Sequence, residues 1–398
     1  MKKANSLLSL AVLFGTNFLC LGEEMKARKV VTIGSATKDV FVKNDEIEHL
    51  EISSKTEKKS YILLEEGKKI SMPNVGVYTG GGSTNTAVSF KRLGFEVSAI
   101  FKIGNDADGK FILEELEKEG INVHAGIKDG VKTGFSFIIP SLSGDRTVFV
   151  HRGANAFLEG VDIPNDLIKN ADLLYLTSLS GDSAKQLQPI TQLAKQSGLD
   201  VAMNPGAGQL RTDSQAVDQL KKSLENIDIL ILNDDEAKIF MHSLVESKTY
   251  SVKQLHAADK SGSKYTPELF ENFIYHKNIM FNLHQFFKEV LSCGPKIVVV
   301  TNGHEGAYVA TKEITYFFPA IVPEKVASTL GAGDSFGSCF VACLSKGLSV
   351  DDSIINATIN ASSVVSFEDA KTGLLTWKEL ENKARNIDKS KLQKFIVS

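Results

Sequence analysis

Beyond about residue 160, short apolar runs alternate with helical segments, and this alternation limits the possible folds more than any other feature. These mostly apolar runs, which we interpret as strands, lie at 172–176, 199–203, 228–232 and 296–301. Segments with helical spacing, such as 183–197 and 214–225, separate them. Strands that alternate with helices in this way pair in parallel through right-handed crossovers. We therefore predict an α/β fold around a parallel sheet, with the functional site at the carboxyl ends of its strands.

The first 160 residues and one later segment have less regular patterns. Hydrophobic spacing predicts strands at 30–34 and 97–103, helices at 85–93 and 109–119, and a β-hairpin from 133–140 and 147–150. The charged, mixed stretch from 44 to 72 indicates exposed strands or a loop outside the main core. Few strand signals occur in residues 242–292, where we expect a helical insertion that serves either as a surface elaboration or as a partner-binding element.

The composition limits the partners and leaves the N-terminus ambiguous. With 42% hydrophobic and 23% charged residues, the 398-residue chain can bury a substantial core. Its formal net charge of −3 provides no basic field for nucleic acid or for an anionic membrane. A basic start and the apolar run 7–14 resemble a weak signal peptide, but Met25 begins a segment that leads directly into a strand. Residues 1–24 are therefore either an export signal or a dispensable extension before a domain that spans 25–398.

A small-residue run before an acid is the first candidate for chemistry. Gly331, Ala332 and Gly333 precede Asp334, and an apolar helical segment follows. Glycines let several backbone N–H groups turn toward one point, and the start of a helix adds partial positive charge, so the run suits a phosphate group. A carboxylate beside that pocket can orient and deprotonate a hydroxyl. Alternatively, Asp334 only caps the helix.

A second glycine run, Gly80–Gly82, lies far upstream and is followed by Asn85. It has no Walker lysine and does not match G-x-G-x-x-G, which disfavours a P-loop and excludes the dinucleotide fingerprint of a dehydrogenase. A close backbone approach next to an amide side chain suits a polyhydroxylated ligand, because Asn85 can both donate and accept hydrogen bonds. The alternative is a glycine-rich turn capped by Asn85 or Ser83.

Taken with their order and separation, the two runs resemble the signatures of the ribokinase-like (PfkB-type) family of carbohydrate and nucleoside kinases. The upstream signature is matched by Gly80-Gly81, Asn85, Ala87, Gly94 and Gly104, and the downstream one by Thr329 and Gly331–Asp334. Three further elements match in order: Asp39 after Gly34-Ser35, Asn233-x-x-Glu236, and Thr301-x-Gly303-x-x-Gly306. The resemblance extends over residues 30–375 apart from the segment 242–292.

The resemblance implies a three-layer α/β/α domain and a small β-rich lid made from about 40–78 and 131–152. It also implies a kinase that uses ATP and Mg²⁺, with Asp334 as the catalytic base and Gly331, Ala332 and Gly333 in the anion hole. Residues expected to bind substrate hydroxyls are Asp39, Gly81 and Asn85. Residues expected to bind ATP are Asn204, Thr301, Gly303, Gly306 and Asn360. Asn233 and Glu236 would hold Mg²⁺ through water, because this ion gives up its hydration shell reluctantly.

Some features within this pattern allow two interpretations. Phe135, Phe137 and Phe149 either line the underside of the lid or pack within its sheet. Arg146 and Arg152 either contact a phosphate or are solvated or paired. Many relatives have Asp where Ser328 stands, and that acid often helps to hold a monovalent cation, so potassium activation stays open.

The expected substrate is a small sugar of the ribose or fructose kind, because no Lys or Arg accompanies Gly82 and Ser83 to bind a phosphorylated acceptor. Adenosine or another nucleoside is the alternative acceptor. A non-catalytic sensor of sugars or nucleotides is the alternative from another class, although a sensor could lose Asp334. We expect a cytoplasmic protein because ATP is abundant there, with no membrane or nucleic-acid partner and with a homodimer through the lid.

Overall fold

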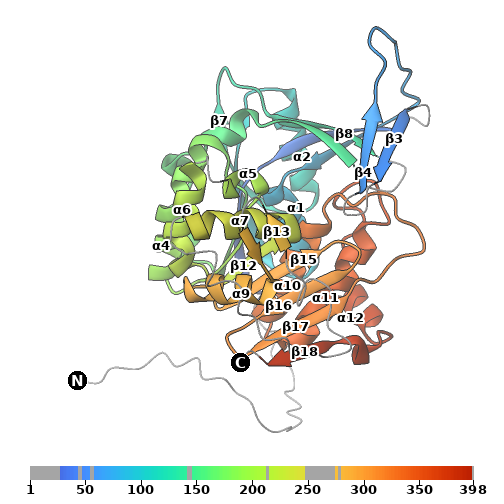
Figure 1. Ribbon diagram of the computed structural model, residues 1–398. Helices are drawn as coiled ribbons and strands as arrows, with labels where there is room; N and C mark the ends of the chain where they lie inside the picture. Colours follow the sequence, from blue (N-terminus) through green and yellow to red (C-terminus); the bar gives the residue numbers. More distant parts are fainter. Residues whose placement is uncertain are drawn as a thin grey trace.

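The computed structural model of the protein describes residues 27–43, 47–53, 58–140, 146–211, 215–246, 274–276 and 279–396. In these residues ten strands form one large sheet in the order β18-β17-β16-β15-β12-β11-β10-β1-β6-β7. Figure 1 shows its strands β15 to β18 beside α11. Seven of them are parallel: β1 (Lys29–Ile33), β6 (Glu96–Gly104), β7 (Asn122–Lys128), β10 (Leu173–Thr177), β11 (Asp200–Asn204), β12 (Ile229–Asn233) and β15 (Ile297–Asn302). Three antiparallel strands extend the β15 edge: β16 (Gly306–Ala310), β17 (Ile314–Pro319) and β18 (Gln393–Ile396). The predicted parallel sheet is confirmed, with an antiparallel extension that the sequence did not indicate.

Helices cover both faces of this sheet and enclose two hydrophobic cores. One core includes residues of α1 (Gly82–Arg92), α2 (Ala107–Lys118), α10 (Ala332–Ser345), α11 (Val350–Val364) and α12 (Trp377–Ala384). The other includes residues of α3 (Asn165–Lys169), α4 (Leu187–Gln196), α6 (Gln215–Ser223), α7 (Asp234–Glu246) and α9 (Leu283–Ser292). Strand β10 serves both cores, since Leu173 and Tyr175 face the first and Leu174 and Leu176 the second. The three-layer α/β/α prediction is confirmed.

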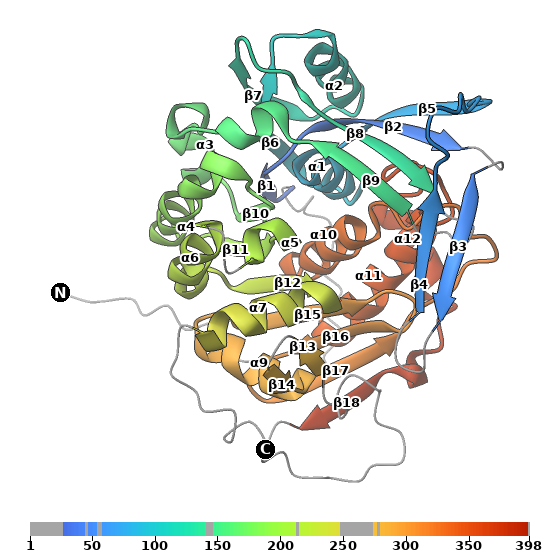
Figure 2. The same ribbon diagram turned by 45° about the horizontal axis from the view of Figure 1, so that its top comes forward.

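A smaller sheet extends from the carboxyl side of the large one and corresponds to the predicted lid (Figure 2). Its strand order is β5-β2-β8-β9, with bounds β2 (Thr37–Lys43), β5 (Asn74–Gly80), β8 (Gly134–Pro140) and β9 (Arg146–His151). Strands β8 and β9 form the expected hairpin. The charged stretch between β2 and β5 contains a separate hairpin of β3 (Glu48–Ser53) and β4 (Lys58–Leu63).

The segment expected as a helical insertion, 242–292, is only partly helical. Helix α7 continues through Glu246 and α9 occupies Leu283–Ser292, but β13 (Ile274–His276) and β14 (Ile279–Phe281) pair as antiparallel strands between them. The helical expectation is therefore wrong for these two short segments, whose β-branched and aromatic side chains favour strands. Residues 247–273 of the segment, and the possible leader 1–24, lie outside the described residues. Among the helices that the structure describes, none is long and apolar enough to cross a membrane.

Candidate active site

A pocket of about 330 Å³ lies where the carboxyl ends of the parallel strands meet the lid. Most of the residues singled out from the sequence line it: Asp39, Gly81, Asn85, Asn204, Asn233, Glu236, Thr301, Gly331, Gly333 and Asp334. They come from elements that are hundreds of residues apart in the chain. The position agrees with the expectation that ligands of an α/β sheet bind outside the carboxyl ends of its strands.

Asp334 lies in the first turn of α10. This helix begins directly after Gly331, which has a left-handed backbone conformation (φ 76°). Glycine is required there, because a Cβ at Gly331 would come within 2.7 Å of the Ala370 Cα. The first turn of a helix leaves its amide hydrogens without partners inside the helix, so the amides beside Asp334 can receive an anion. Burial raises the pKa of Asp334, while a hydrogen bond from Asn85 and the charges of Lys371 and Arg146 oppose this shift. A carboxylate with a raised pKa is a stronger base.

Asn85 links the glycine turn to Asp334. Its Nδ2 donates a hydrogen bond to Asp334 Oδ2 at 2.8 Å. The side chain is buried, and its Oδ1 has no hydrogen-bond partner within the described part of the chain. A buried carbonyl oxygen without a partner is costly, so a ligand hydroxyl that donates to it would be bound favourably.

Asp39 faces the pocket from the lid strand β2. It is 7% exposed, and its Oδ1 accepts a hydrogen bond from the hydroxyl of Thr37 at 2.9 Å. Burial raises its pKa, whereas hydrogen bonds from Thr37 and Ser136 and the charge of Lys371 lower it. The opposite strand must carry glycine at position 80, because a Cβ there would overlap the Asp39 carboxylate at 1.8 Å. The upstream glycine run therefore makes room for an acid as well as for a ligand.

The lid presents two different faces. Strand register places Asp39, Ser136 and Val150 in one cross-strand row, and these three side chains line the pocket. The next row joins Phe137 to Phe149, which are 44% and 56% exposed and lie on the opposite face. One interpretation of the sequence placed these phenylalanines on the underside of the lid. The structure contradicts it for Phe137 and Phe149, which lie on the other face.

Arg146, at the start of β9, is the lid arginine that reaches the pocket. Its guanidinium donates to the hydroxyl of Thr329, next to the loop that is expected to form the anion hole. Arg152 directly follows β9 and lines a separate pocket together with Ser178 and Gly208. Of the two arginines considered from the sequence, the structure brings Arg146 to the site.

Asn233 and Glu236 form a capping box at the start of α7. The backbone nitrogen of Asn233 donates to Glu236 Oε2 at 3.0 Å, and the backbone nitrogen of Glu236 donates to Asn233 Oδ1 at 2.8 Å. Burial raises the pKa of Glu236 to about 7. Among the described residues, no three His, Cys, Asp or Glu side chains gather in a way that could hold a metal ion. One carboxylate and one amide oxygen still fit Mg²⁺, which commonly keeps several waters and takes few protein ligands.

The expected nucleotide residues separate into two groups. Asn204 is the last residue of β11, Thr301 is the second-last residue of β15, and both line the pocket. Gly303 and Gly306 form the β15–β16 turn with φ values of 50° and 132°, and neither lines the pocket. Asn360 is fully buried: its Nδ2 donates to the Ser335 carbonyl and its Oδ1 accepts from the Leu375 amide. Its hydrogen bonds argue for a structural role, so ATP contact by Asn360 stays a prediction that the structure does not favour.

One charged residue near the pocket went unnoticed in the sequence. Lys371 lies in the loop after α11, and its charge acts on both Asp39 and Asp334. Its neighbours in the sequence match no motif, and only the folded chain shows what its side chain approaches.

Fold and pocket together define a small-molecule kinase: a three-layer α/β/α domain, a lid, and a carboxylate beside an amide-lined helix start. The chain belongs to the pfkB family of carbohydrate kinases, whose family model matches residues 28–265 and 274–377. It is therefore a phosphotransferase with an alcohol group as acceptor. The ribokinase-like resemblance of the sequence is confirmed.

Individual relatives are distant. The chain is 27% identical over 321 residues to a ribokinase of Staphylococcus aureus (strain COL), an alignment that covers 80% of this chain and 86% of the relative. It is 25% identical over 315 residues to a 5-dehydro-2-deoxygluconokinase of Bacillus subtilis (strain 168), covering 76% and 86%. A solved Arabidopsis thaliana ribokinase, complexed with ribose and ATP, superimposes with a TM-score of 0.66 at 21% identity, covering 91% of this chain and all (100%) of that one. This last likeness shows the fold.

Proposed function

We propose that the protein transfers the γ-phosphoryl group of ATP to a hydroxyl of a small, neutral sugar of the ribose or fructose kind. The observation that carries the proposal is the hydrogen bond between Asn85 and Asp334 in a pocket that also contains Asp39. A base, two groups for hydroxyls and an amide-lined helix start thus meet in one place, as hydroxyl phosphorylation requires.

The residues of the chain can divide the reaction among themselves. Asp39 and the Asn85 Oδ1 bind hydroxyls of the acceptor. Asp334 takes the proton of the attacking hydroxyl as its oxygen bonds to the γ-phosphorus and the bond from that phosphorus to the β-phosphate oxygen breaks. Amides at the start of α10, with Arg146 on the lid, stabilise the negative charge of the transferred group. Closure of the lid excludes water and limits ATP hydrolysis.

Asn233 and Glu236 are the residues that would hold Mg²⁺, through water. When bound, the ion would neutralise phosphate charge. Ser328 stands where many family members have Asp; it is buried, and its hydroxyl accepts a hydrogen bond from the Leu330 backbone amide at 3.1 Å. Potassium dependence therefore stays an open prediction.

The charges of the pocket favour a neutral acceptor. Asp39 and Asp334 already face it, and Arg146 is committed to Thr329 at its phosphate side. Glu236 lines the pocket as well, so an acidic sugar would add a further negative charge there, and the described residues that line the pocket include no Lys or Arg besides Arg146. A nucleoside is the second candidate, because Ile138, Val148 and Val150 form an apolar wall on the lid that a base could contact.

The test is ADP release, measured by a coupled assay with ribose, fructose, an aldonate and adenosine as acceptors. We expect the highest kcat/KM with a neutral sugar, and a loss of at least ~10²-fold in Asp334→Asn, as is typical for a general base. Asp352→Asn is the matched control, since Asp352 pairs with Lys389 on the surface of α11. Equal rates in wild type and Asp334→Asn on every acceptor would favour the sensor alternative.

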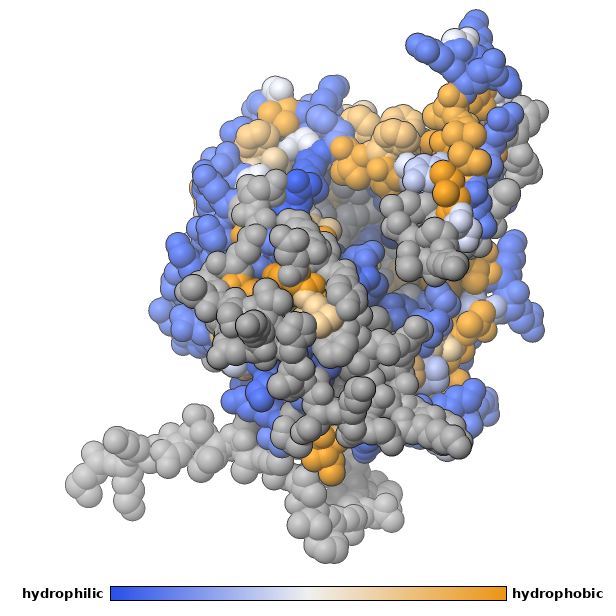
Figure 3. Space-filling view, viewed as in Figure 1, coloured by the Kyte–Doolittle hydropathy of each residue, from blue (hydrophilic) through white to orange (hydrophobic). Residues whose placement is uncertain are grey.

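We also infer a homodimer through the outer face of the lid, in the cytoplasm where ATP is abundant. Val77, Val40, Phe137 and Phe149 form one row across the four lid strands. Apolar side chains gather over the lid and the β3–β4 hairpin (Figure 3). Contiguous exposed apolar surface commonly marks an association site. Recovery of the native protein from an exported fraction would contradict the cytoplasmic location.

A further inference from the structure

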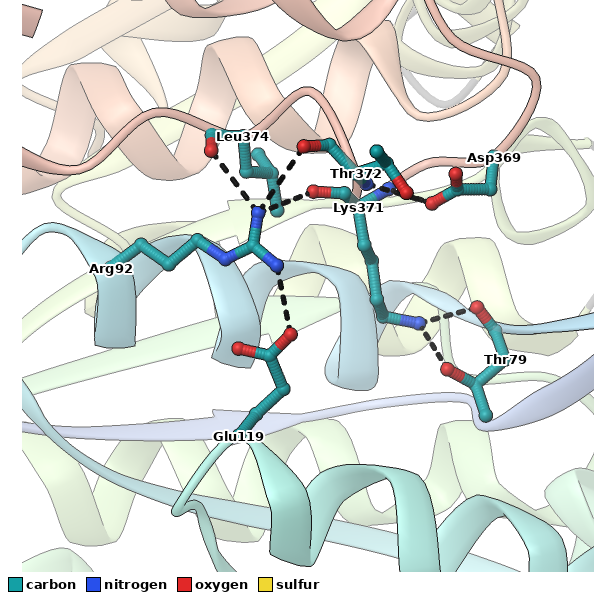
Figure 4. A network of polar contacts seen from close by, with 7 residues as sticks. All are labelled: Thr79, Arg92, Glu119, Asp369, Lys371, Thr372 and Leu374. Atoms are coloured by element: carbon teal, nitrogen blue, oxygen red, sulfur yellow. Dashed lines mark hydrogen bonds and ion pairs between the residues drawn. The ribbon is translucent and has the colours of Figure 1, made fainter. Parts of the chain in front are cut away.

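Lys371 reaches from a loop near the C-terminus to the glycine turn beside the pocket (Figure 4). Its ammonium donates hydrogen bonds to the backbone carbonyl and the hydroxyl of Thr79, and to the hydroxyl of Thr84 at 3.3 Å. Thr79 and Thr84 bracket Gly80–Gly82, the turn that leads into Asn85. Three oxygens of this turn therefore bind one positive charge.

The loop that carries Lys371 is itself fixed in place (Figure 4). Arg92, the last residue of α1, donates to the carbonyls of Lys371 at 2.7 Å and Leu374 at 3.1 Å, and pairs with Glu119 at 2.8 Å. Asp369 Oδ1 accepts from the backbone amide of Lys371 at 2.7 Å. The same helix thus holds the loop at its end and receives the ammonium at its start, which leaves Lys371 little freedom to move.

The charge of Lys371 has four acidic neighbours. Asp39 on β2, Asp334 on α10, Asp369 in its own loop and Glu119 after α2 all interact with it electrostatically. Burial lowers the pKa of Lys371 to about 8, while these acids raise it. Asp39 and Asp334 face one pocket, and two carboxylates in one site oppose each other's ionisation. Both are needed as anions if one binds hydroxyls and the other accepts a proton.

We propose that Lys371 is a positioning residue for phosphoryl transfer: its ammonium holds the Gly80–Gly82 turn and supplies the charge that keeps Asp39 and Asp334 ionised together. It touches neither substrate hydroxyl nor phosphate. Its contribution reaches the reaction through the shape of the turn and through the protonation of the two acids. Arg146 also acts on Asp334 through its charge, but it approaches from the lid and is bound to Thr329, not to the glycine turn.

The kinetic arm compares pH profiles of kcat/KM for wild type, Lys371→Arg and Lys371→Met. Because Lys371→Met removes the ammonium charge, its acidic limb should lie about one pH unit higher than that of the wild type. This shift is the lower end of the pKa change that a nearby opposite charge causes in a carboxylate. In the wild type, loss of the Lys371 proton should lower activity on the alkaline side. Lys371→Arg should retain activity to higher pH, because a guanidinium stays charged. Lys346→Met is the control, since Lys346 is also partly buried but stacks over Phe95 and Trp377.

A second arm needs no acceptor and separates this inference from the proposed sugar kinase reaction, on which the kinetic arm rests. Carboxyl ¹³C shifts of labelled aspartate are titrated in wild type and Lys371→Met, and Asp39→Asn and Asp334→Asn assign the signals. Both signals should titrate at higher pH in Lys371→Met and stay unchanged in Lys346→Met. Unchanged titration in folded Lys371→Met would overturn the proposal, even if activity fell. If Lys371→Met does not fold, the pH profile of Lys371→Arg decides. An alkaline limb identical to that of the wild type would then overturn the proposal.

Discussion

Replacing Asn85 with Asp tests the assignment of Asp334 most directly. The two side chains have nearly the same shape, so the change removes a donor and adds a charge without creating a cavity. In the native site the Asn85 Nδ2 donates to Asp334 Oδ2 at 2.8 Å. In Asn85→Asp, two carboxylates would meet at this position and share one proton. The ionised form of Asp334, which can accept a proton, would then be rarer at neutral pH.

The size of the effect follows from this separation. Two unit charges about 4 Å apart, after slight relaxation, repel by about 4 kcal/mol at an effective dielectric constant of ~20. Since 1.36 kcal/mol corresponds to tenfold, ionised Asp334 becomes rarer by at most ~10³-fold. Asn85→Leu adds no charge and loses only a hydrogen bond to a charged group, about 1.5–3 kcal/mol, which corresponds to ~10–10²-fold. The charged variant should therefore be the more damaged one at neutral pH.

The assay is coupled ADP release as a function of pH and acceptor concentration. Asn85→Asp should show an acidic limb at higher pH than wild type and a larger loss in kcat than in acceptor KM, because Asp still offers an acceptor oxygen to the substrate. Asn85→Leu should mainly raise the acceptor KM, because the unpartnered Oδ1 is gone. If Asn85→Asp kept the wild-type kcat and acidic limb, Asp334 could not be the base.

Three further predictions concern stability and assembly. Gly331→Ala should lower the free energy of unfolding by ~2–4 kcal/mol in urea titrations, because residue 331 has a φ of 76° and a Cβ there would clash with the backbone. Gly333→Ala is the control and should leave the free energy of unfolding unchanged, because a Cβ there meets nothing within 4 Å. Phe149→Glu should convert the dimer to a monomer, as measured by light scattering. Val161→Glu, at an 88% exposed position, should leave the mass unchanged. A monomeric wild type would contradict the lid dimer. Burial raises the pKa of Asp228, but hydrogen bonds from two lysines outweigh this and lower it overall, so Asp228→Asn should cost about 2 kcal/mol above pH 4. Because the folded-state pKa is depressed, the difference from wild type should close as pH falls below 4, and a constant gap would contradict the ion-pair explanation.

The main sheet was predictable because its strands are buried on both faces. Runs such as 173–176 and 229–232 are continuously apolar, which is typical of a strand between two helical layers. The antiparallel edge was not predictable, since β18 lies at the far end of the chain and pairs with β17 only after the helices α10 to α12. The short strands β13 and β14 were missed because three residues are too few to show a period.

The site was predictable where local backbone chemistry defines it. Gly331 and Gly81 have positive φ values, and such positions leave a signature in the sequence. The pairing of Asn85 with Asp334 left none, because a hydrogen bond between side chains 249 positions apart depends on the packing of α1 against α10. The same holds for Asn360, whose amide suited a ligand by type but is used by the Ser335 carbonyl and the Leu375 amide. Residue type indicated what each side chain can do, and only the fold decides what it meets.

Three consecutive residues after α11 connect the two halves of the pocket. Ala370 packs against Gly331 on the phosphate side, Lys371 binds the glycine turn on the acceptor side, and Asp369 fixes the loop between them. Because these contacts lie within one short, hydrogen-bonded loop, a displacement that loosens one should loosen the other. The acceptor turn and the anion hole are thus mechanically linked through a loop that contacts neither ligand in the proposed reaction. The same loop also brings the ammonium of Lys371, late in the chain, into electrostatic interaction with Asp39 of β2.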